Sequence, residues 1–317
     1  MASPASVLAG FARDVRDGLT RSPKQLPPQY FYDAIGSVLF EAITLLPEYG
    51  LTRADEKLLS QCAFEVASLV QCPALVAELG SGSGRKTRRL LEAFLARGRT
   101  RYIPIDISAE ALHLCLNELS DLPAEMSPLE GSYLDGLLGA AKDRNPAESL
   151  LVLFLGSTIG NFDRAESLTF LRSVRQVLRA GDTLLLGTDL VKRELILRAA
   201  YDDPTGVTAA FNLNLLARIN RELGAGFDLR LFRHEVRYSA ATQRVEMHLR
   251  SLEAQTIHIP AAELTLDLEE GETIWTESSH KYTIPDIQHL ASSTGFTIER
   301  QWIEHDWGFA ETLLRAA

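Results

Sequence analysis

The stretch ALVAELGSGSG, residues 74–84, decides the fold of this chain. An apolar run at 74–79 meets the three glycines Gly80, Gly82 and Gly84, and a basic segment from Lys86 to about Ala96 follows. Glycines let a backbone approach a ligand closely, and open sheets bind ligands at the carboxyl ends of their strands. The stretch predicts a strand, a ligand-binding loop and a helix, although alone it is equally compatible with a turn that binds nothing.

Further apolar runs lie on both sides of this unit. Strands are expected at 101–106, 150–155 and 183–187, and earlier helices at 36–47 and 53–70. Because these strands are apolar on both faces and alternate with helices, they predict a mostly parallel sheet covered by helices, an α/β fold.

Residues 195–285 do not continue this alternation of apolar strands and helices. A helical stretch at about 205–224 precedes segments that alternate between apolar and polar residues, at 232–238, 244–250 and 255–259. A period of two is typical of antiparallel strands with one solvated face, so we expect a second, smaller lobe here. From Pro285 the sequence returns to a helix and two closing strands.

The chain is expected to divide into four segments. These are an N-terminal helical part of the smaller lobe at 1–60, a Rossmann-like domain at 61–194, the rest of the lobe at 195–285, and a return to the Rossmann-like domain at 286–317.

Composition limits the classes of partner. The chain has 317 residues and a net charge of −10, so nucleic acid and anionic membranes are poor partners. No apolar stretch approaches the roughly 18 to 20 residues of a membrane span, and the N-terminus lacks a signal core, so we expect a cytoplasmic protein. Three unpatterned cysteines and seven scattered histidines predict neither disulfides nor a metal site. Nothing signals an interface, so a monomer is expected.

An acid at the end of the second strand suggests the kind of ligand. Asp106 is placed to bind both hydroxyls of a ribose, and Glu78 immediately precedes the glycine loop. The loop is not the G-x-G-x-x-G of dinucleotide binders, because Arg85 stands where the third glycine would be. Acids near the loop suit a zwitterionic sulfonium better than a diphosphate, and a dinucleotide-dependent oxidoreductase remains the alternative.

Many separated motifs then occur in order along the chain. They are YFYD (30–33), GSVLF (36–40), LPEY (46–49), TR (52–53), ELGSG (78–82), KTR (86–88), FLGSTIGN (154–161), LGTDLVK (186–192), YDD (201–203), GVTAAFN (206–212), EM (246–247) and TESSHK (276–281). With these motifs the chain resembles the histidine Nα-methyltransferases of ergothioneine biosynthesis, which trimethylate histidine to hercynine. The resemblance covers nearly the whole chain and implies a Rossmann-like methyltransferase domain, dependent on S-adenosylmethionine (SAM), with a smaller substrate-binding lobe.

The resemblance also implies roles for individual residues. Gly80, Lys86 and Asp106 match positions that hold SAM, and Ser132 and Tyr133 follow the glycine of the adenine-binding loop.

For the substrate, the resemblance implies three groups of residues. They are Tyr32, Phe40 and Gly156 around the accepting amine, Asn161 and Tyr201 at the carboxylate, and Tyr49, Glu277 and Ser279 at the imidazole ring, with Met247 nearby. Met247 is equally expected as a packing residue of a strand, and Lys192 and Lys281 as solvated side chains.

Two departures from the family pattern keep alternatives open. Ser132 replaces an acid and offers the adenine amino group a weaker acceptor, which leaves room for a non-catalytic SAM-binding protein. Gly50 and Leu51 change the loop after Tyr49, which leaves room for an enzyme that methylates another aromatic amino acid or amine.

Overall fold

The computed structural model describes residues 4–317, with side chains from residue 8 onward. The chain forms two compact units: unit 1 contains the residues up to Tyr49 and Arg193–Ser279, and unit 2 contains Gly50–Lys192 and His280–Ala317. The sequence placed the divisions after residues 60, 194 and 285, whereas the compact units divide the chain at Gly50, Arg193 and His280.

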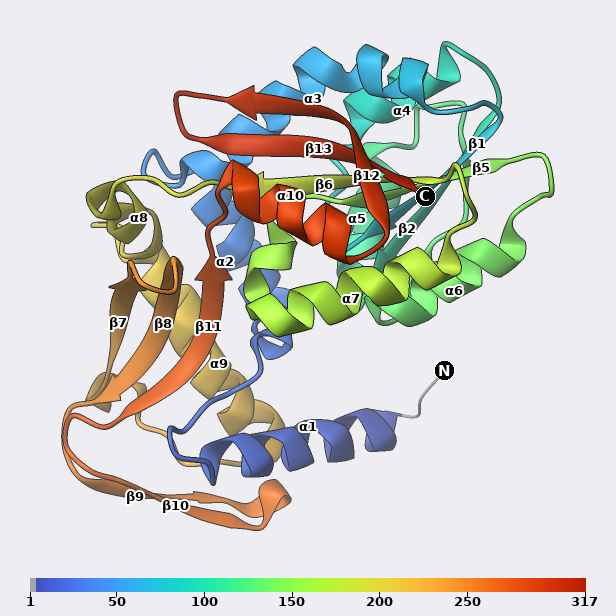
Figure 1. Cartoon of the computed structure of the whole chain (residues 1–317). Helices are drawn as coiled ribbons and strands as arrows, with labels where there is room; N and C mark the ends of the chain where they lie inside the picture. The colour runs from blue at the N-terminus through green and yellow to red at the C-terminus, as the bar shows by residue number, and fades with distance from the viewer. Residues whose placement is uncertain (1–3) are drawn as a thin grey trace. The chain divides into compact units, whose positions relative to one another are not determined.

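An eight-stranded sheet forms the centre of unit 2 (Figure 1). Its strands are β1 (Ala74–Leu79), β2 (Thr100–Asp106), β3 (Glu125–Met126), β4 (Leu129–Glu130), β5 (Ser149–Phe154), β6 (Thr183–Asp189), β12 (Phe296–Glu304) and β13 (Phe309–Ala316). The order is β12-β13-β6-β5-β1-β2-β3, and β4 also pairs with β2. Strands β6, β5, β1, β2 and β3 are parallel, whereas β13 is antiparallel to both β6 and β12. The predicted parallel sheet and two closing strands are confirmed.

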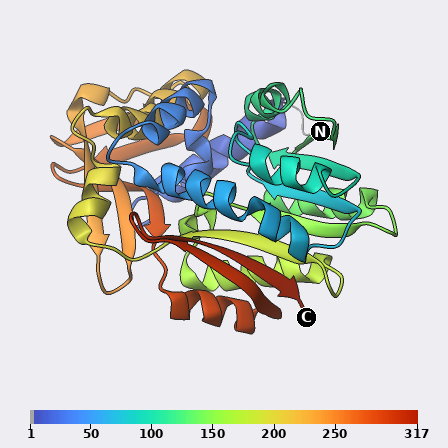
Figure 2. The same ribbon diagram turned by 90° about the horizontal axis from the view of Figure 1, so that it is seen from above.

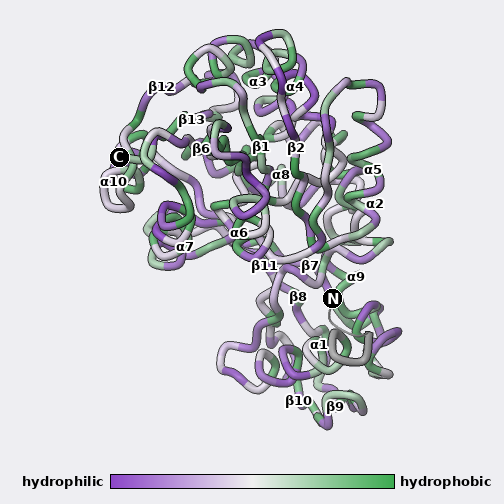
Figure 3. The backbone as a smooth tube through the Cα atoms, turned by 90° about the vertical axis from the view of Figure 1, so that its right-hand side faces the viewer, coloured by the Kyte–Doolittle hydropathy of each residue, from purple (hydrophilic) through white to green (hydrophobic). Residues whose placement is uncertain are grey.

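Helices cover both faces of this sheet (Figures 1 and 2). They are α3 (Gly50–Leu69), α4 (Arg88–Leu95), α5 (Ala109–Glu118), α6 (Tyr133–Asp143), α7 (Arg164–Val177) and α10 (Ile284–Ser293). Alternate residues of β1 enter two cores: Leu75 and Ala77 pack with α6, α7 and α10, and Ala74 and Val76 pack with α3, α4 and α5. This explains why β1 is apolar throughout, while the edge strand β12 is largely hydrophilic (Figure 3).

Strand β1 marks the point where the strand order reverses. The chain passes from β1 to its neighbour β2 on one side, and from the other neighbour of β1, strand β5, to β6 in the opposite direction. In open α/β sheets, ligands bind in the crevice at such a point. The glycine loop at 80–84 lies there.

Unit 1 combines helices with a small sheet. Its elements are α1 (Pro4–Leu19), η1 (Pro28–Phe31), α2 (Ala34–Thr44), α8 (Glu194–Tyr201), α9 (Val207–Leu223), η3 (Leu229–Leu231), β7 (Phe232–Ser239), β8 (Arg244–Ser251), β9 (Gln255–Ile259), η4 (Pro260–Ala262), β10 (Leu264–Leu268) and β11 (Thr273–His280). One sheet has the order β11-β8-β7, and β9 and β10 form a separate pair. The antiparallel pairing of β7 with β8 confirms the prediction from the period of two. Strands β10 and β11 were not expected.

Among residues 4–317, no helix has the length and apolar character required to cross a bilayer. The same part of the chain holds no group of three or more His, Cys, Asp or Glu side chains that could bind a metal ion.

Candidate active site

The glycine loop of unit 2 folds over the end of β2. Gly80, Gly82 and Gly84 have φ angles of 75°, 52° and 72°, a region that L side chains rarely adopt. The amides of Gly80 and Ser81 donate to the carbonyl of Ile105, at 2.8 and 3.2 Å. A Cβ at Gly82 would meet nothing within 4 Å. The loop therefore leaves open space at Gly82, where a ligand could approach the backbone.

Asp106 lies beside this loop, and each of its carboxylate oxygens accepts one backbone N–H. Gly82 donates to Oδ2 at 3.1 Å and Ser108 donates to Oδ1 at 3.0 Å. Burial raises the pKa of Asp106, and the backbone hydrogen bonds oppose that shift. A carboxylate has about four acceptor positions, so Asp106 keeps acceptor capacity for ribose hydroxyls. The loop and Asp106 thus fit an adenosine cofactor.

Glu78 is a buried residue near the carboxyl end of β1, just before the loop. It is 2% exposed and accepts the Thr87 hydroxyl at 2.7 Å and the Tyr102 hydroxyl. Burial raises the pKa of Glu78 to about 7. The side chain therefore joins the start of α4 to β2 inside the core of unit 2.

Tyr133 and Ser132 lie at the start of α6. A Cβ at Gly80 would be 3.3 Å from the ring of Tyr133, so the tyrosine packs directly against the loop. Burial, followed by the charge of Asp106, raises the pKa of Tyr133 to about 12. The Ser132 hydroxyl caps α6 by accepting the Asp135 amide at 3.3 Å, and it donates to the Asp135 carboxylate at 2.6 Å. Contact of either residue with adenine stays a prediction.

Asp55, on α3, joins two of the predicted site residues. Its Oδ2 accepts the Lys86 ammonium at 2.8 Å and the Gly156 amide at 3.0 Å. Burial lowers the pKa of Lys86, but the charge and hydrogen bond of Asp55 outweigh burial and the net shift is upward, so the lysine stays cationic. Sequence reasoning missed Asp55, although it follows the TR motif that was singled out.

Glu311, on β13, completes this cluster. It is fully buried, and its carboxyl group interacts with that of Asp55. Within the described part of the chain, no donor group reaches Oδ1 of Asp55 or either oxygen of Glu311. Two carboxyl groups can share a hydrogen bond only if one keeps its proton. Burial, then the charge and hydrogen bond of Asp55, raise the pKa of Glu311 well above its usual range, so Glu311 is the donor.

The segment that follows β5 is held by contacts within unit 2. Ser157 has a left-handed φ of 58°, and its hydroxyl accepts the Asp189 amide at 2.9 Å. A Cβ at Gly160 would lie 2.7 Å from the carbonyl oxygen of His280, so only glycine fits. The short helix η2 (Thr158–Asn161) then ends at the half-buried Asn161. Asn161 thus follows the carboxyl end of β5, next to β1 in the sheet.

Lys192 and Lys281 are not solvated, contrary to the expectation from sequence. Their side chains are 7% and 0% exposed, and both pair with Asp189, Lys281 at 2.8 Å. Trp307 donates to the same carboxylate at 2.9 Å, and the Lys192 ammonium lies 4.5 Å from the centre of its ring. Burial lowers the pKa of Lys192 to about 8 although Asp189 opposes the shift. A paired aspartate makes the burial of both lysines possible.

In unit 1, three predicted substrate residues come together. The Tyr201 hydroxyl donates to Oγ of Ser279 at 2.8 Å, and the rings of Tyr49 and Tyr201 pack edge to face at 6.1 Å. All three side chains are buried. Glu277 is half-buried two residues before Ser279 on β11, and therefore on the same face of the strand.

Tyr32 and Phe40 form a second group in unit 1. Their rings pack edge to face at 5.6 Å, and both rest on Phe211, at 5.9 and 6.0 Å. Phe211 lies in the GVTAAFN motif, but its contact with the other two rings could not be inferred from its position in the sequence. Met247 is 2% exposed on β8 and its carbonyl accepts the Thr276 hydroxyl at 3.0 Å, so it packs inside unit 1.

Comparison with known proteins identifies the family. Residues 11–316 match the family described as histidine-specific methyltransferase, SAM-dependent. The chain belongs to this family. Histidine N-alpha-methyltransferase from Mycobacterium tuberculosis is 41% identical over 95% of this chain and 93% of its own length. The protein of the same name from Mycolicibacterium smegmatis is 41% identical over 97% and 95%. Ergothioneine biosynthesis protein 1 from Neurospora crassa is 37% identical over 64% of this chain and 23% of its own length.

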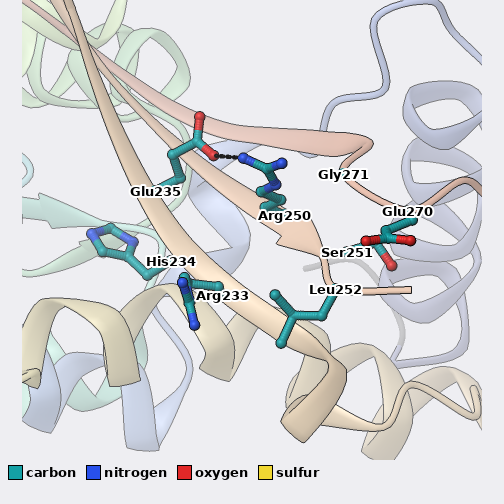
Figure 4. A pocket seen from close by; sticks show the side chains of 8 residues that line it. All are labelled: Arg233, His234, Glu235, Arg250, Ser251, Leu252, Glu270 and Gly271. Atoms are coloured by element: carbon teal, nitrogen blue, oxygen red, sulfur yellow. Dashed lines mark ion pairs between the residues drawn. The ribbon is translucent and has the colours of Figure 1, made fainter. Parts of the chain in front are cut away.

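In this histidine-specific methyltransferase, the predicted residues fall into a cofactor group and a substrate group. The cofactor group, with Gly156 and Asn161, lies in unit 2, and the remaining substrate residues lie in unit 1. A pocket of about 410 Å³ on the β7–β8 side of unit 1 contains none of the predicted residues (Figure 4). It is lined by charged side chains, and Arg250 pairs with Glu235 across it at 3.5 Å. We therefore do not assign it to the methyltransferase reaction.

Proposed function

We propose that this SAM-dependent methyltransferase adds three methyl groups to the α-amine of L-histidine, giving hercynine for ergothioneine biosynthesis. The observation that carries the proposal is 41% identity, over nearly the whole of both chains, to two proteins named histidine N-alpha-methyltransferase. The open glycine loop and Asp106 support the choice of cofactor.

The cofactor is assigned to unit 2. Asp106 would hold the ribose hydroxyls, Gly80 would let the backbone approach the ligand, and Lys86 would pair with the carboxylate of the methionine end. Ser132 and Tyr133 would border the adenine. When bound, SAM supplies a methyl group that its sulfonium has already activated, so the protein's main task is alignment.

The accepting amine must be neutral to attack. A free α-amine is largely protonated near neutral pH, and each pKa unit of that deficit costs about 1.4 kcal/mol. We propose that the amine loses its proton to water on entry and that the Tyr32 hydroxyl and the Gly156 carbonyl orient its lone pair. Tyr32 and Phe40 present aromatic faces that tolerate the growing, finally cationic head through cation–π attraction of roughly 0.5 to 2 kcal/mol.

Substrate selection is assigned to polar groups. Asn161 and Tyr201 would bind the substrate carboxylate. Glu277 would accept a hydrogen bond from one imidazole N–H, and Ser279 would hydrogen-bond to the other ring nitrogen. Tyr49 would border the ring. A phenyl ring has no N–H to donate to Glu277, so it would lose the hydrogen bond that histidine makes there and bind less well. Because Met247 is buried inside unit 1, we assign it a packing role beside the imidazole pocket rather than a direct contact with the substrate.

A mass-spectrometric assay tests the proposal. Purified protein and SAM are offered all twenty amino acids, and gains of one, two and three methyl groups on histidine alone are expected. Methylation of another amino acid would reject the imidazole assignment, and SAM binding without any methylation would favour a non-catalytic role.

A variant tests the imidazole assignment separately. Glu277→Ala is expected to reduce the preference for histidine by about tenfold or more while SAM affinity stays unchanged. Glu253→Ala, an exposed glutamate of the same unit, is the control and should change neither. An unchanged histidine KM in Glu277→Ala would remove Glu277 from the pocket.

We further propose that the enzyme acts as a cytoplasmic monomer. All three cysteines are free thiols, as a reducing compartment favours. Light scattering on purified protein tests the monomer, and fractionation of the source cells tests the compartment.

A further inference from the structure

We propose that His234 is a positioning residue: as a neutral ring protonated at Nε2, it fixes Tyr201 and strand β11 as two walls of the histidine pocket. This inference rests on the proposed function, because it takes Tyr201 and Glu277 as substrate residues. It concerns residues of unit 1 only, and the sequence assigned no role to His234, Asn212 or Thr276.

A buried hydrogen-bond network carries the inference. The ring of His234 contacts the Tyr201 carbonyl through Nε2 at 2.8 Å and Nδ2 of Asn212 through Nδ1 at 2.8 Å. The same Nδ2 donates to the carbonyl of His248 at 3.1 Å, and the Thr276 hydroxyl reaches Oδ1 of Asn212 at 2.8 Å. Asn212 and Thr276 are 0% and 1% exposed, so water cannot replace the bonds between these two residues and to the carbonyl of His248.

The network has one consistent arrangement of protons. A carbonyl oxygen only accepts, so Nε2 of His234 must carry the hydrogen that meets Tyr201. The carbonyl of His248 likewise requires the amide nitrogen of Asn212 to face it. That nitrogen donates its second hydrogen to Nδ1 of His234, which must therefore be unprotonated.

Protonation of His234 would break this arrangement. An imidazolium would direct an N–H at the amide nitrogen of Asn212, and the conflict could be relieved only by turning the amide over. The amide oxygen would then face the carbonyl oxygen of His248, and one buried hydrogen bond would be lost. The geometry thus favours the neutral ring.

The charges around His234 agree with a neutral ring. Burial lowers its pKa, and this outweighs the hydrogen bond to Tyr201 and the negative charges of Asp202 and Asp203 after α8. On the β7–β8 side, Arg233, Glu235, Arg250 and Glu270 line the pocket that His234 borders (Figure 4). From α9, the uncharged Asn212 is the contact.

The network reaches the predicted pocket at two points. At one end it holds the main chain of Tyr201, whose hydroxyl bonds to Ser279. At the other end it holds Thr276, the residue before Glu277 on β11. Loss of the bridge would let the two walls shift, and displacements of about 1 Å can cost as much as a hundredfold in rate.

Kinetics of His234→Phe test the positioning role. This change keeps a ring but removes both hydrogen bonds, and we expect KM for histidine to rise roughly ten- to a hundredfold while the Kd for SAM stays within about twofold. His258→Phe, at an exposed side chain of β9, is the matched control and should change neither value. An unchanged histidine KM, or an equal loss of SAM affinity, would overturn the positioning role.

Nitrogen NMR of histidine-labelled protein tests the protonation state without reference to the substrate. The His234 signals, assigned through the sequential backbone resonances of the wild-type protein, should be those of a neutral ring protonated at Nε2. Asn212→Asp places a carboxylate opposite Nδ1, so in this variant the ring should become an imidazolium and KM for histidine should rise. Asn220→Asp, on the same helix but bonded to Phe227, should leave the ring neutral.

The outcomes separate this inference from the proposed function. A ring protonated at Nδ1 in the wild type, or a neutral ring in Asn212→Asp, would overturn the inference even if histidine is methylated. If His234→Phe does not fold, these two measurements still decide it. Failure of the proposed function would instead appear as the absence of histidine methylation by the wild-type enzyme.

Discussion

The protonated Glu311 predicts an unusual dependence of stability on pH. In the folded protein its proton is held by burial and by the bond to Asp55. In the unfolded chain the same carboxyl group ionises near pH 4.5. Above that pH the unfolded state binds fewer protons than the folded state, so the free energy of unfolding falls as pH rises, until pH reaches the folded pKa.

Glu311→Gln removes this penalty and keeps the hydrogen bond. An amide has nearly the shape of the protonated acid and can donate one N–H to Asp55. Near pH 4.5 the variant should match the wild type. Its free energy of unfolding should then exceed that of the wild type by up to about 1.4 kcal/mol for each further pH unit, or roughly 3 kcal/mol two units higher. Glu311→Leu instead leaves a buried Asp55 oxygen unpaired and should cost about 1–3 kcal/mol.

Urea unfolding of the three proteins between pH 5 and pH 8 measures these differences. Glu299→Gln, on the neighbouring strand β12, is the control, because its surface pair with Arg315 lowers the pKa of Glu299. The free energy of unfolding of Glu299→Gln should not increase relative to that of the wild type as pH rises. If the free energies of unfolding of the wild type and Glu311→Gln change in parallel with pH, Glu311 is not protonated in the folded state.

Three further changes test the cofactor site, the amine site and the packing of unit 2. Asp106→Ala should weaken SAM binding by calorimetry by about ten- to a hundredfold, because a charged acceptor contributes roughly 1.5–3 kcal/mol. Phe40→Ala should slow the third methyl transfer most, so that dimethylhistidine accumulates in a mass-spectrometric time course. Gly136→Ala should lower the free energy of unfolding in urea by about 1–3 kcal/mol, because its Cβ would lie 2.3 Å from Ile105. Gly226→Ala, whose Cβ would meet nothing within 4 Å, should stay within about 0.5 kcal/mol of the wild type.

The fold of unit 2 could be predicted because its signals are local. The continuous apolar runs of β1 and β5 and the glycines at 80–84 are each readable within a few residues. Strand β11 gave no such signal, because its inward-facing side chains include the hydroxyl of Thr276. That hydroxyl is satisfied by Asn212 and by the carbonyl of Met247, and both partners are distant in the sequence.

The same distinction applies to the candidate site. Asp106 and Asn161 follow recognisable strands, so their positions could be inferred. Asp55 and Glu311 could not be found, since an acid in a helix or strand is usually solvated and only their mutual contact makes them unusual. Lys281 was expected at the surface because a buried cation is costly, and the partner that permits its burial, Asp189, comes from another strand end.

The place of β13 in the sheet has a consequence for synthesis and turnover. This strand, residues 309–316, pairs with β6 on one side and β12 on the other, although it is made after both. Until it arrives, the apolar strand β6 has a bare edge that can recruit strands from other chains. Proteolytic loss of these few residues would recreate that edge, so a clipped enzyme should aggregate rather than persist as a weakened catalyst.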